Sequence, residues 1–570
     1  SFVGGSGTDT LSYTGATAGI TLTVTSNGAG TTTGDGADTF LNFENYILSD
    51  NADTANLNAV HGSTINAGAL SDTASYSTVG SGTALTVTVN SGNTSATVSD
   101  GTKTDTLQNI EKIIGGDGND TFIVSNVTGL DTLDGDGGTN TLQLSGTLDL
   151  SAVTLLNFQY IVIANGDTLT LNAVDLSGKT LNITMNGTGS LVIVSDASSH
   201  DFSNISVTKG TGTVTLDVNI NKDISAVNIN NIIDRFDVAS GNSLTLSYSQ
   251  FNGHTGINSG TLKLSDTSLT GAQIKSVNDA STNAIDLTNV TTISTSTMAE
   301  ALEIVNNTGA AFTTAPNYAI TISDTSSASN VNLVAGDTTG IVTATVTADT
   351  AANLNATLTN ATATDALTLT VNGATAQATD LIGLDNKTSV DVSVTATAVS
   401  GTFANLNTVY VTNAANYANL GDENVTITDT TSASNVNIIL GATSGNVTAI
   451  VTADTAAALN TALTNATTGT DVLTLTVNGA TAQATDLIDL DGKTSVDVSV
   501  TATAVSGTFA NLNTVYVTNV ANYVNLGDEN VTITDTTSAA NANTILGATS
   551  GNVTATVSTD TAANLNSALT

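Results

Sequence analysis

The sequence predicts an all-β fold in which parallel β-roll or β-solenoid repeats form an elongated rod. The first observation is compositional: Lys, Arg and Glu are scarce, and only six of the 49 acidic residues are Glu. Thr and Val favour pleated strands, whereas Asp, Asn and Gly favour tight turns. The second observation is that short alternating stretches, such as Thr168–Leu171 and Leu191–Val194, are separated by such turns. The third is internal repetition, which is typical of solenoids.

The last 250 residues are a tandem array. Thr321–Thr325 returns as Thr426–Thr430 and again as Thr532–Thr536, at offsets of 105 and 106 residues. We therefore divide this region into three units: repeat 1 at 321–425, repeat 2 at 426–531 and a partial repeat 3 at 532–570. Because the third copy stops in mid-unit and the first residue is Ser1, we expect this sequence to be part of a longer polypeptide.

One repeat contains five strand-like stretches in about 105 residues, or about 21 residues per stretch. The stretches are Val425–Thr430, Val447–Thr452, Leu473–Val477, Val496–Val500 and Val515–Thr518. This spacing suits the coils of a β-solenoid, which stack about 4.8 Å apart and bury a continuous core. The alternative is a tandem of immunoglobulin-like β-sandwiches in 321–570, since about 100 residues is also the size of that fold. With 4% aromatic residues, the chain favours the narrow solenoid core.

Two further regions precede the array. Residues 1–145 show a looser duplication of about 65 residues, in which Asp38–Glu44 corresponds to Asp105–Glu111. Residues 146–320 keep the alternating stretches without a fixed period, which predicts an irregular β-solenoid region. Helical signals are few: Ala299–Ile304 is the best candidate, and Asp349–Leu354 could form one turn.

The most specific local motif is Gly115–Ile123, which fits the nonapeptide Gly-Gly-x-Gly-x-Asp-x-apolar-x of calcium-binding β-rolls. Its glycines permit turn conformations that aim backbone carbonyls inward, and its Asp residues add hard oxygen ligands. Calcium takes six to eight oxygens, so one nonapeptide supplies half a site and needs a stacked neighbour. Weaker neighbours begin at Gly4, Gly34 and Asp134, and the last of them carries Asn140 where the motif has Asp. The candidate calcium-site residues are Gly116, Asp117, Asn119, Asp120, Gly5, Asp9, Asp38, Asp134 and Asp136.

These motifs make residues 1–145 resemble the RTX family, the bacterial secreted surface proteins with hemolysin-type calcium-binding repeats. Residues 131–195 resemble the linkers found beside such repeats in large RTX surface proteins. The resemblance implies type I secretion, a parallel β-roll and folding in external calcium. The nonapeptides here are not tandem, which departs from the family pattern, as does Asn140.

The Thr-rich and Cys-free composition also resembles RTX-type S-layer proteins. We therefore expect a structural protein of the bacterial cell surface, a subunit of an S-layer, sheath or filament that calcium stabilises and that assembles with itself. Cell-surface polysaccharide is a further expected partner. Two alternatives are the stalk of a giant RTX adhesin and the non-catalytic part of an RTX enzyme or toxin.

Several function classes are excluded or disfavoured. A net charge of −39 excludes a nucleic-acid partner, and the absence of Cys excludes thiolate metal sites. No apolar run approaches the length of a transmembrane segment. His61, His200 and His254 show no catalytic spacing, so we predict no enzyme. The acidic turns Asp422-Glu423 and Asp528-Glu529 either hold calcium between coils or are simply solvated.

Overall fold

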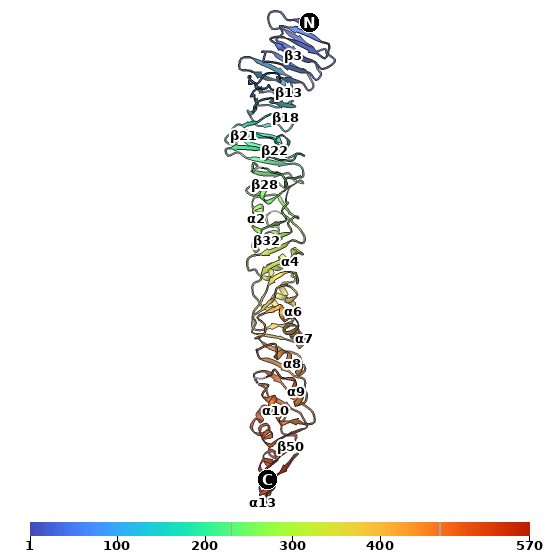
Figure 1. The fold of residues 1–570 in the computed structure, drawn as a ribbon, viewed down its shortest axis with the longest axis vertical. Coiled ribbons are helices and arrows are strands. Elements are labelled where there is room, and N and C mark those ends of the chain that lie inside the picture. The colour runs from blue at the N-terminus through green and yellow to red at the C-terminus, as the bar shows by residue number, and fades with distance from the viewer. Residues whose placement is uncertain (230, 310, 467–468) are drawn as a thin grey trace. The chain divides into compact units, whose positions relative to one another are not determined.

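The protein is rich in strands, and most of its sheets are parallel and built from successive coils (Figure 1). The computed structural model describes residues 1–229, 231–309, 311–466 and 469–570. It divides into two compact units. Unit 1 comprises Ser1–Thr291 with Asn306–Ala315, and unit 2 comprises Thr292–Val305 with Pro316–Thr570.

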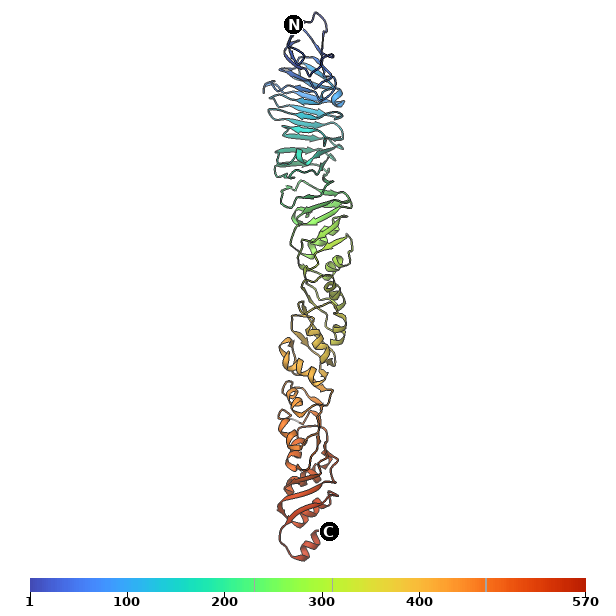
Figure 2. The same ribbon diagram turned by 90° about the vertical axis from the view of Figure 1, so that its right-hand side faces the viewer.

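Unit 1 begins with two large sheets whose strands lie side by side in successive coils (Figure 2). The nine-stranded sheet runs in the order β1 (Phe2–Val3), β5 (Asp38–Leu41), β4 (Ala29–Thr33), β3 (Thr21–Ser26), β7 (Thr54–Leu57), β9 (Thr73–Ser75), β13 (Lys112–Ile114), β15 (Thr132–Asp134) and β18 (Thr154–Leu156). The eleven-stranded sheet runs in the order β2 (Thr10–Ser12), β6 (Asn45–Ile47), β8 (Thr64–Asn66), β12 (Thr104–Gln108), β11 (Ala96–Ser99), β10 (Thr86–Val89), β14 (Thr121–Val124), β16 (Thr141–Leu144), β19 (Tyr160–Ile163), β21 (Leu181–Met185) and β23 (Ile205–Lys209). β4 lies between β3 and β5 and is antiparallel to both, and β11 lies between β10 and β12 and is antiparallel to both. The strands β4 and β11 start 67 residues apart.

Unit 1 also contains two smaller parallel sheets, the strand β30 (Ser268–Leu269) and α-helices. The six-stranded sheet runs in the order β17 (Leu148–Asp149), β20 (Thr168–Asn172), β22 (Ser190–Val194), β24 (Val214–Val218), β26 (Arg235–Val238) and β28 (Thr255–Ile257). The five-stranded sheet runs in the order β25 (Lys222–Asp223), β27 (Ser243–Leu246), β29 (Thr261–Leu264), β31 (Ala284–Leu287) and β33 (Phe312–Thr314). The helices are α1 (Tyr248–Phe251) and α2 (Gly271–Asp279).

Apolar side chains form continuous columns through these coils. In β20 every second residue is buried, and Leu171 pairs with Ile193 in the next coil. Ile193 in turn pairs with Leu216, which pairs with Phe236. All four side chains are fully buried. Because parallel strands stay in register, each coil adds its apolar residue to the column left by the previous one.

Unit 2 combines short parallel strands with helices. Its strands are β32 (Thr292–Ser296), β34 (Ala319–Ile322), β35 (Val342–Thr345), β36 (Ala366–Thr368), β37 (Thr370–Val371), β38 (Ala376–Gln377), β39 (Val392–Val394), β40 (Ala398–Gly401), β41 (Tyr417–Ala418), β42 (Asn424–Ile427), β43 (Val447–Ile450), β44 (Val472–Thr474), β45 (Thr476–Val477), β46 (Ala482–Gln483), β47 (Val498–Val500), β48 (Ala504–Gly507), β49 (Tyr523–Val524), β50 (Asn530–Thr537) and β51 (Val553–Val557). Its helices are α3 (Met298–Val305), α4 (Ala328–Asp337), α5 (Ala351–Thr357), α6 (Ala378–Asp385), α7 (Phe403–Asn407), α8 (Ala433–Leu440), α9 (Ala456–Ala462), α10 (Ala484–Asp491), α11 (Phe509–Asn513), α12 (Ala539–Leu546) and α13 (Ala562–Ala568).

The helices follow the sequence repeat. α4, α8 and α12 begin at Ala328, Ala433 and Ala539, offsets of 105 and 106 residues. A Ser or Thr side chain accepts the backbone N–H three residues later at the start of each of these helices, and of α5, α7, α9, α11 and α13. Such caps satisfy amides that the first helical turn leaves free.

Several sequence predictions can be compared directly with these elements. A parallel, solenoid-like stack of strands is confirmed, and the strand pairs described in 321–570 are parallel, unlike those of an immunoglobulin-like sandwich. The all-β prediction is incomplete, because each repeat also contains helices. The strand predicted at Val515–Thr518 is wrong. Residues Thr514–Thr518 form a π-helical turn that continues α11, and Val515 and Tyr516 within this turn are buried. The helix predicted at Ala299–Ile304 is confirmed by α3.

Candidate functional site

The nonapeptide turn lies directly against the equivalent turn of the next coil. Residues 115–120 connect β13 to β14, and residues 135–140 connect β15 to β16. Gly115 N–H donates to the Asp134 carbonyl at 2.8 Å, and Thr139 N–H donates to Asn119 Oδ1 at 2.8 Å. A side chain at Gly118 would place its Cβ 2.0 Å from the Thr83 carbonyl oxygen. Glycine is therefore required at this position by the close approach of the loop that precedes β10.

Asp120 is a buried acceptor that closes its own turn. Its Oδ1 accepts the Leu85 N–H and its Oδ2 accepts the Gly116 N–H, both at 2.7 Å. Burial raises the pKa of Asp120, and the N–H donors of Leu85 and Gly116 lower it. Because both carboxylate oxygens already face amides, this side chain contributes first to the turn and only secondarily to any cation.

Asn140 replaces the motif's Asp for a reason visible in its contacts. Its Oδ1 accepts the Asp120 N–H at 2.9 Å, as an aspartate could. Its Nδ2 donates to the carbonyls of Gly137 and Asn157, both at 3.0 Å, which an ionised aspartate cannot do. The Asn140 N–H then donates to Gln159 Oε1 at 2.7 Å. Asp120, Asn140 and Gln159 thus form a ladder, which we call the turn ladder.

The other carboxylates of the two turns repel one another. Burial raises the pKa of Asp136, and the charges of Asp134 and Asp117 raise it further. Asp134 Oδ1 accepts the Asp136 N–H at 2.9 Å and the Asn157 Nδ2 at 2.7 Å. Over the described ranges, no group of three or more His, Cys, Asp or Glu side chains is arranged to hold a metal ion. A calcium ion at these turns would therefore depend on backbone carbonyls and water for much of its coordination.

The remaining predicted residues divide into two arrangements. Asp9 Oδ2 accepts the Gly5 N–H at 2.6 Å, the same local geometry as Asp120 and Gly116. Asp38 instead lies on strand β5, where its Oδ2 accepts the Tyr13 hydroxyl at 3.4 Å. Asp9 and Asp120 are therefore equivalent turn-closing residues, and Asp38 is not.

A second ladder of buried carboxylates was not predicted. Asp53 accepts the N–H groups of Ile20 at 2.5 Å and Ser49 at 2.7 Å. Its own N–H donates to Asp72 Oδ1 at 2.6 Å, and the Asp72 N–H donates to Glu111 Oε2 at 2.7 Å. Asp53 and Asp72, like Asp120, come immediately before a Thr that begins a strand. An Asp-Thr dipeptide at the start of a strand is therefore the sequence pattern from which Asp53 and Asp72 could have been predicted.

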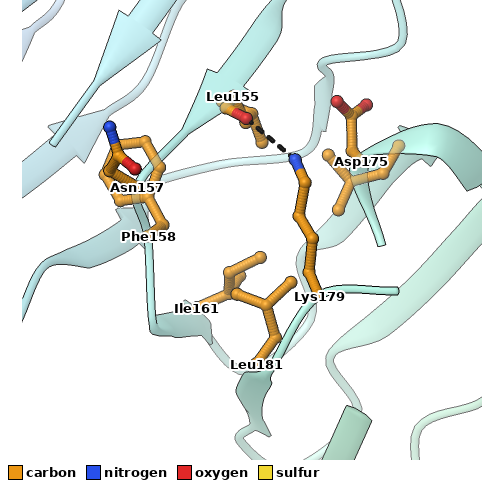
Figure 3. A pocket seen from close by; sticks show the side chains of 8 residues that line it. Leu155, Asn157, Phe158, Ile161, Asp175, Lys179 and Leu181 are labelled. Atoms are coloured by element: carbon orange, nitrogen blue, oxygen red, sulfur yellow. Dashed lines mark hydrogen bonds between the residues drawn. The ribbon is translucent and has the colours of Figure 1, made fainter. Parts of the chain in front are cut away.

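Two sites that resemble enzyme features have no room for a substrate. The cavity in Figure 3 encloses about 20 Å³, room for about one water molecule, and Lys179 Nζ donates to the Leu155 carbonyl at 3.1 Å across it. The Ser195 hydroxyl lies 2.8 Å from His200 Nε2, but these residues are only 4% and 0% exposed. Burial lowers the pKa of His200. Both arrangements stabilise the interior of unit 1.

Comparisons with known proteins identify no relative. No family model, no curated protein and no solved structure matches the chain significantly. Among the helices of the described ranges, none is long and apolar enough to cross a membrane.

Proposed function

We propose that this chain is a structural protein of a bacterial cell surface, a secreted subunit of an S-layer, sheath or filament. The observation that carries the proposal is the stacking of parallel coils on continuous apolar columns. Such a stack can be lengthened coil by coil without altering its core, which suits a scaffold. The near-identical units at 105- and 106-residue offsets supply regular lateral surfaces for contact with further copies of the chain.

Calcium acts on this scaffold in two ways. At the nonapeptide turns it relieves the repulsion among Asp117, Asp134 and Asp136. Between molecules it screens a net charge of −39, which would otherwise keep them apart. Both effects require the millimolar calcium found outside cells, in agreement with the RTX resemblance of residues 1–145.

The test is electron microscopy of the purified full chain with millimolar calcium and with a chelator. We expect sheets or filaments in calcium and dispersed particles after chelation. Sodium chloride of the same ionic strength is the control for simple screening. Dispersed particles in calcium would contradict self-assembly and favour an adhesin stalk.

A second measurement separates calcium binding from assembly. Calcium is expected to raise the melting temperature of the wild type more than it raises that of D117N/D134N/D136N. An equal rise in both proteins, or no rise in either, would contradict calcium at the nonapeptide turns.

A further inference from the structure

An acidic pocket recurs in unit 2 at the repeat spacing. The first copy is an open pocket of about 410 Å³, lined by residues 394–397 and by Asn419, Asp422 and Glu423. The second copy has the same volume, about 410 Å³, and is lined by the equivalent residues 500–503, Asn525, Asp528 and Glu529. In each copy, one wall is the C-terminal end of a strand, β39 or β47, with the residues that follow it. The other wall is the turn that carries the two carboxylates.

One carboxylate oxygen in each pocket is buried without a partner. Glu423 is 3% exposed; its Oε2 accepts the Gly421 N–H at 2.8 Å and the Tyr410 hydroxyl at 3.2 Å. Glu529 is also 3% exposed, and its Oε2 accepts the Gly527 N–H at 2.8 Å and the Tyr516 hydroxyl at 3.1 Å. Within the described part of the chain, neither Oε1 has a hydrogen-bond partner.

A buried carboxylate oxygen without a partner is costly, and the same defect in two copies indicates a missing positive ligand. The neighbouring tyrosine cannot supply a positive charge, because its hydroxyl is neutral and becomes negative when it loses its proton. The residues that line the two pockets include two acids each and no Lys, Arg or His among those described. Oxygen atoms from carboxylates, backbone carbonyls and water are the ligands that calcium prefers.

We propose that each pocket binds one calcium ion, held by Glu423 and Asp422 in the first copy and by Glu529 and Asp528 in the second. Backbone carbonyls along 394–397 and 500–503, together with water, complete the coordination. Each ion thereby connects an acidic turn to the preceding coil. These sites are separate from the nonapeptide turns. The proposal rests on the proposed function in one respect, namely that an extracellular protein is exposed to calcium.

The segment just before repeat 1 provides a natural contrast. The positions 105 residues before Asp422 and Glu423 are Asn317 and Tyr318, which have no carboxylate. The Tyr318 hydroxyl donates to Asp337 Oδ2 at 2.7 Å, so this copy is satisfied by a different contact. The chain should therefore contain two such sites and not three.

The test is the number of calcium ions bound by the full chain, measured by equilibrium dialysis with radioactive calcium. Glutamine preserves the shape of each glutamate and removes its charge, so E423Q/E529Q should bind two fewer ions than the wild type. E423Q alone should bind one fewer. Because Asp422 and Asp528 are exposed, D422N/D528N should fold normally and lower the affinity of the same two ions at least tenfold.

The matched control is D391N/D497N, which removes two exposed carboxylates from the same repeats outside the pockets. This variant should bind as many ions as the wild type. Unchanged stoichiometry in E423Q/E529Q together with unchanged affinity in D422N/D528N would overturn the proposal and indicate protonated glutamates. That outcome would not contradict self-assembly or calcium binding at the nonapeptide turns. Conversely, a failure to assemble would not contradict the binding of two calcium ions in these pockets.

Discussion

Carboxylates of unit 1 act mainly as acceptors for the backbone of a neighbouring coil. Asp53 and Asp120 each use both oxygens to accept N–H groups, one from the neighbouring coil and one from four residues earlier in the chain. Hydrogen bonds to an ionised acceptor are shorter and stronger than neutral ones. This role explains why so much of the acid is Asp, whose short side chain keeps the carboxylate close to the turn.

Asp72 is the residue for which pH should matter most. It is fully buried and its Oδ2 has no partner among the described residues. Burial raises the pKa of Asp72 from 3.8 to about 7, aided by the charges of Asp53 and Glu111 and opposed by the Asp53 N–H. The folded protein therefore binds this proton more tightly than the unfolded chain, so the stabilisation is complete below about pH 4 and is lost as the pH rises through about 7.

D72N should remove this dependence, because asparagine is neutral throughout and its Oδ1 can still accept the Asp53 N–H. In the presence of a chelator, we expect D72N to melt a few degrees above the wild type at pH 8 and to lose this advantage at pH 5. The exposed D391N is the control and should follow the wild type at both pH values. A constant difference between D72N and wild type across this range would mean that Asp72 titrates normally.

At residue scale, the sequence identified the position of Asp120 but not the two hydrogen bonds that its carboxylate accepts. The glycines of the nonapeptide predicted a tight turn at 115–120, and the structure contains one. The amides that Asp120 accepts come from Gly116, in the motif, and from Leu85, 35 residues away. No local pattern contains the second partner, because it depends on which coil lies alongside.

At the scale of one element, a buried threonine organises the start of a coil in each repeat. Thr494 Oγ1 accepts the N–H groups of Leu473 at 3.0 Å and Val496 at 3.2 Å and donates to the Leu473 carbonyl at 2.8 Å. Thr388 makes the same three kinds of contact 106 residues earlier. One hydroxyl thus pairs with both backbone groups of a buried leucine and with the amide of a partly exposed valine.

T494V tests the contribution of the Thr494 hydroxyl, because valine matches threonine in shape and lacks only the hydroxyl group. We expect a loss of about 1–3 kcal/mol in the free energy of unfolding, since the buried amide of Leu473 loses its acceptor. T494S keeps the hydroxyl and should lose less than T494V. Urea denaturation of both variants measures the difference, and equal losses would show that packing of the methyl group matters more than the hydroxyl.

The elements of unit 2 show what periodicity could and could not predict. Val447–Thr452 was predicted as a strand from alternation and became β43. Val515–Thr518 had the same β-branched composition but follows the helix capped by Thr508, and the chain continues in helical form through Thr518. Helices such as α8 were not predicted, because Ala433–Leu440 is rich in Asn and Ser, and its helical conformation depends on the Ser432 cap and on burial of Val436 and Ile439.

At the scale of the whole molecule, stability should depend on neighbours in the stack. Leu191 pairs with Leu169 in the coil before it and with Val214 in the coil after it, and all three side chains are fully buried. In such a stack each coil contacts mainly the coils beside it, so a substitution should destabilise its own coil and the two adjacent ones more than distant coils.

L191A should show this locality. The cavity is expected to cost about 2–5 kcal/mol. Hydrogen exchange should accelerate in β20, β22 and β24, while β3 and β7 keep the protection they have in the wild type. Uniform acceleration through unit 1 would instead mean that the unit unfolds as a single cooperative body.

The two ladders of polar side chains give the stack a direction. In each step the amide belongs to the earlier coil and the accepting oxygen to the later one, as from Leu85 to Asp120 and from Asp120 to Asn140. At these ladder positions, the face of a coil towards later residues therefore presents amides, and the face towards earlier residues presents accepting oxygens. Two like faces would leave the ladder amides or the ladder oxygens without partners, so the ladders continue only where coils are joined head to tail.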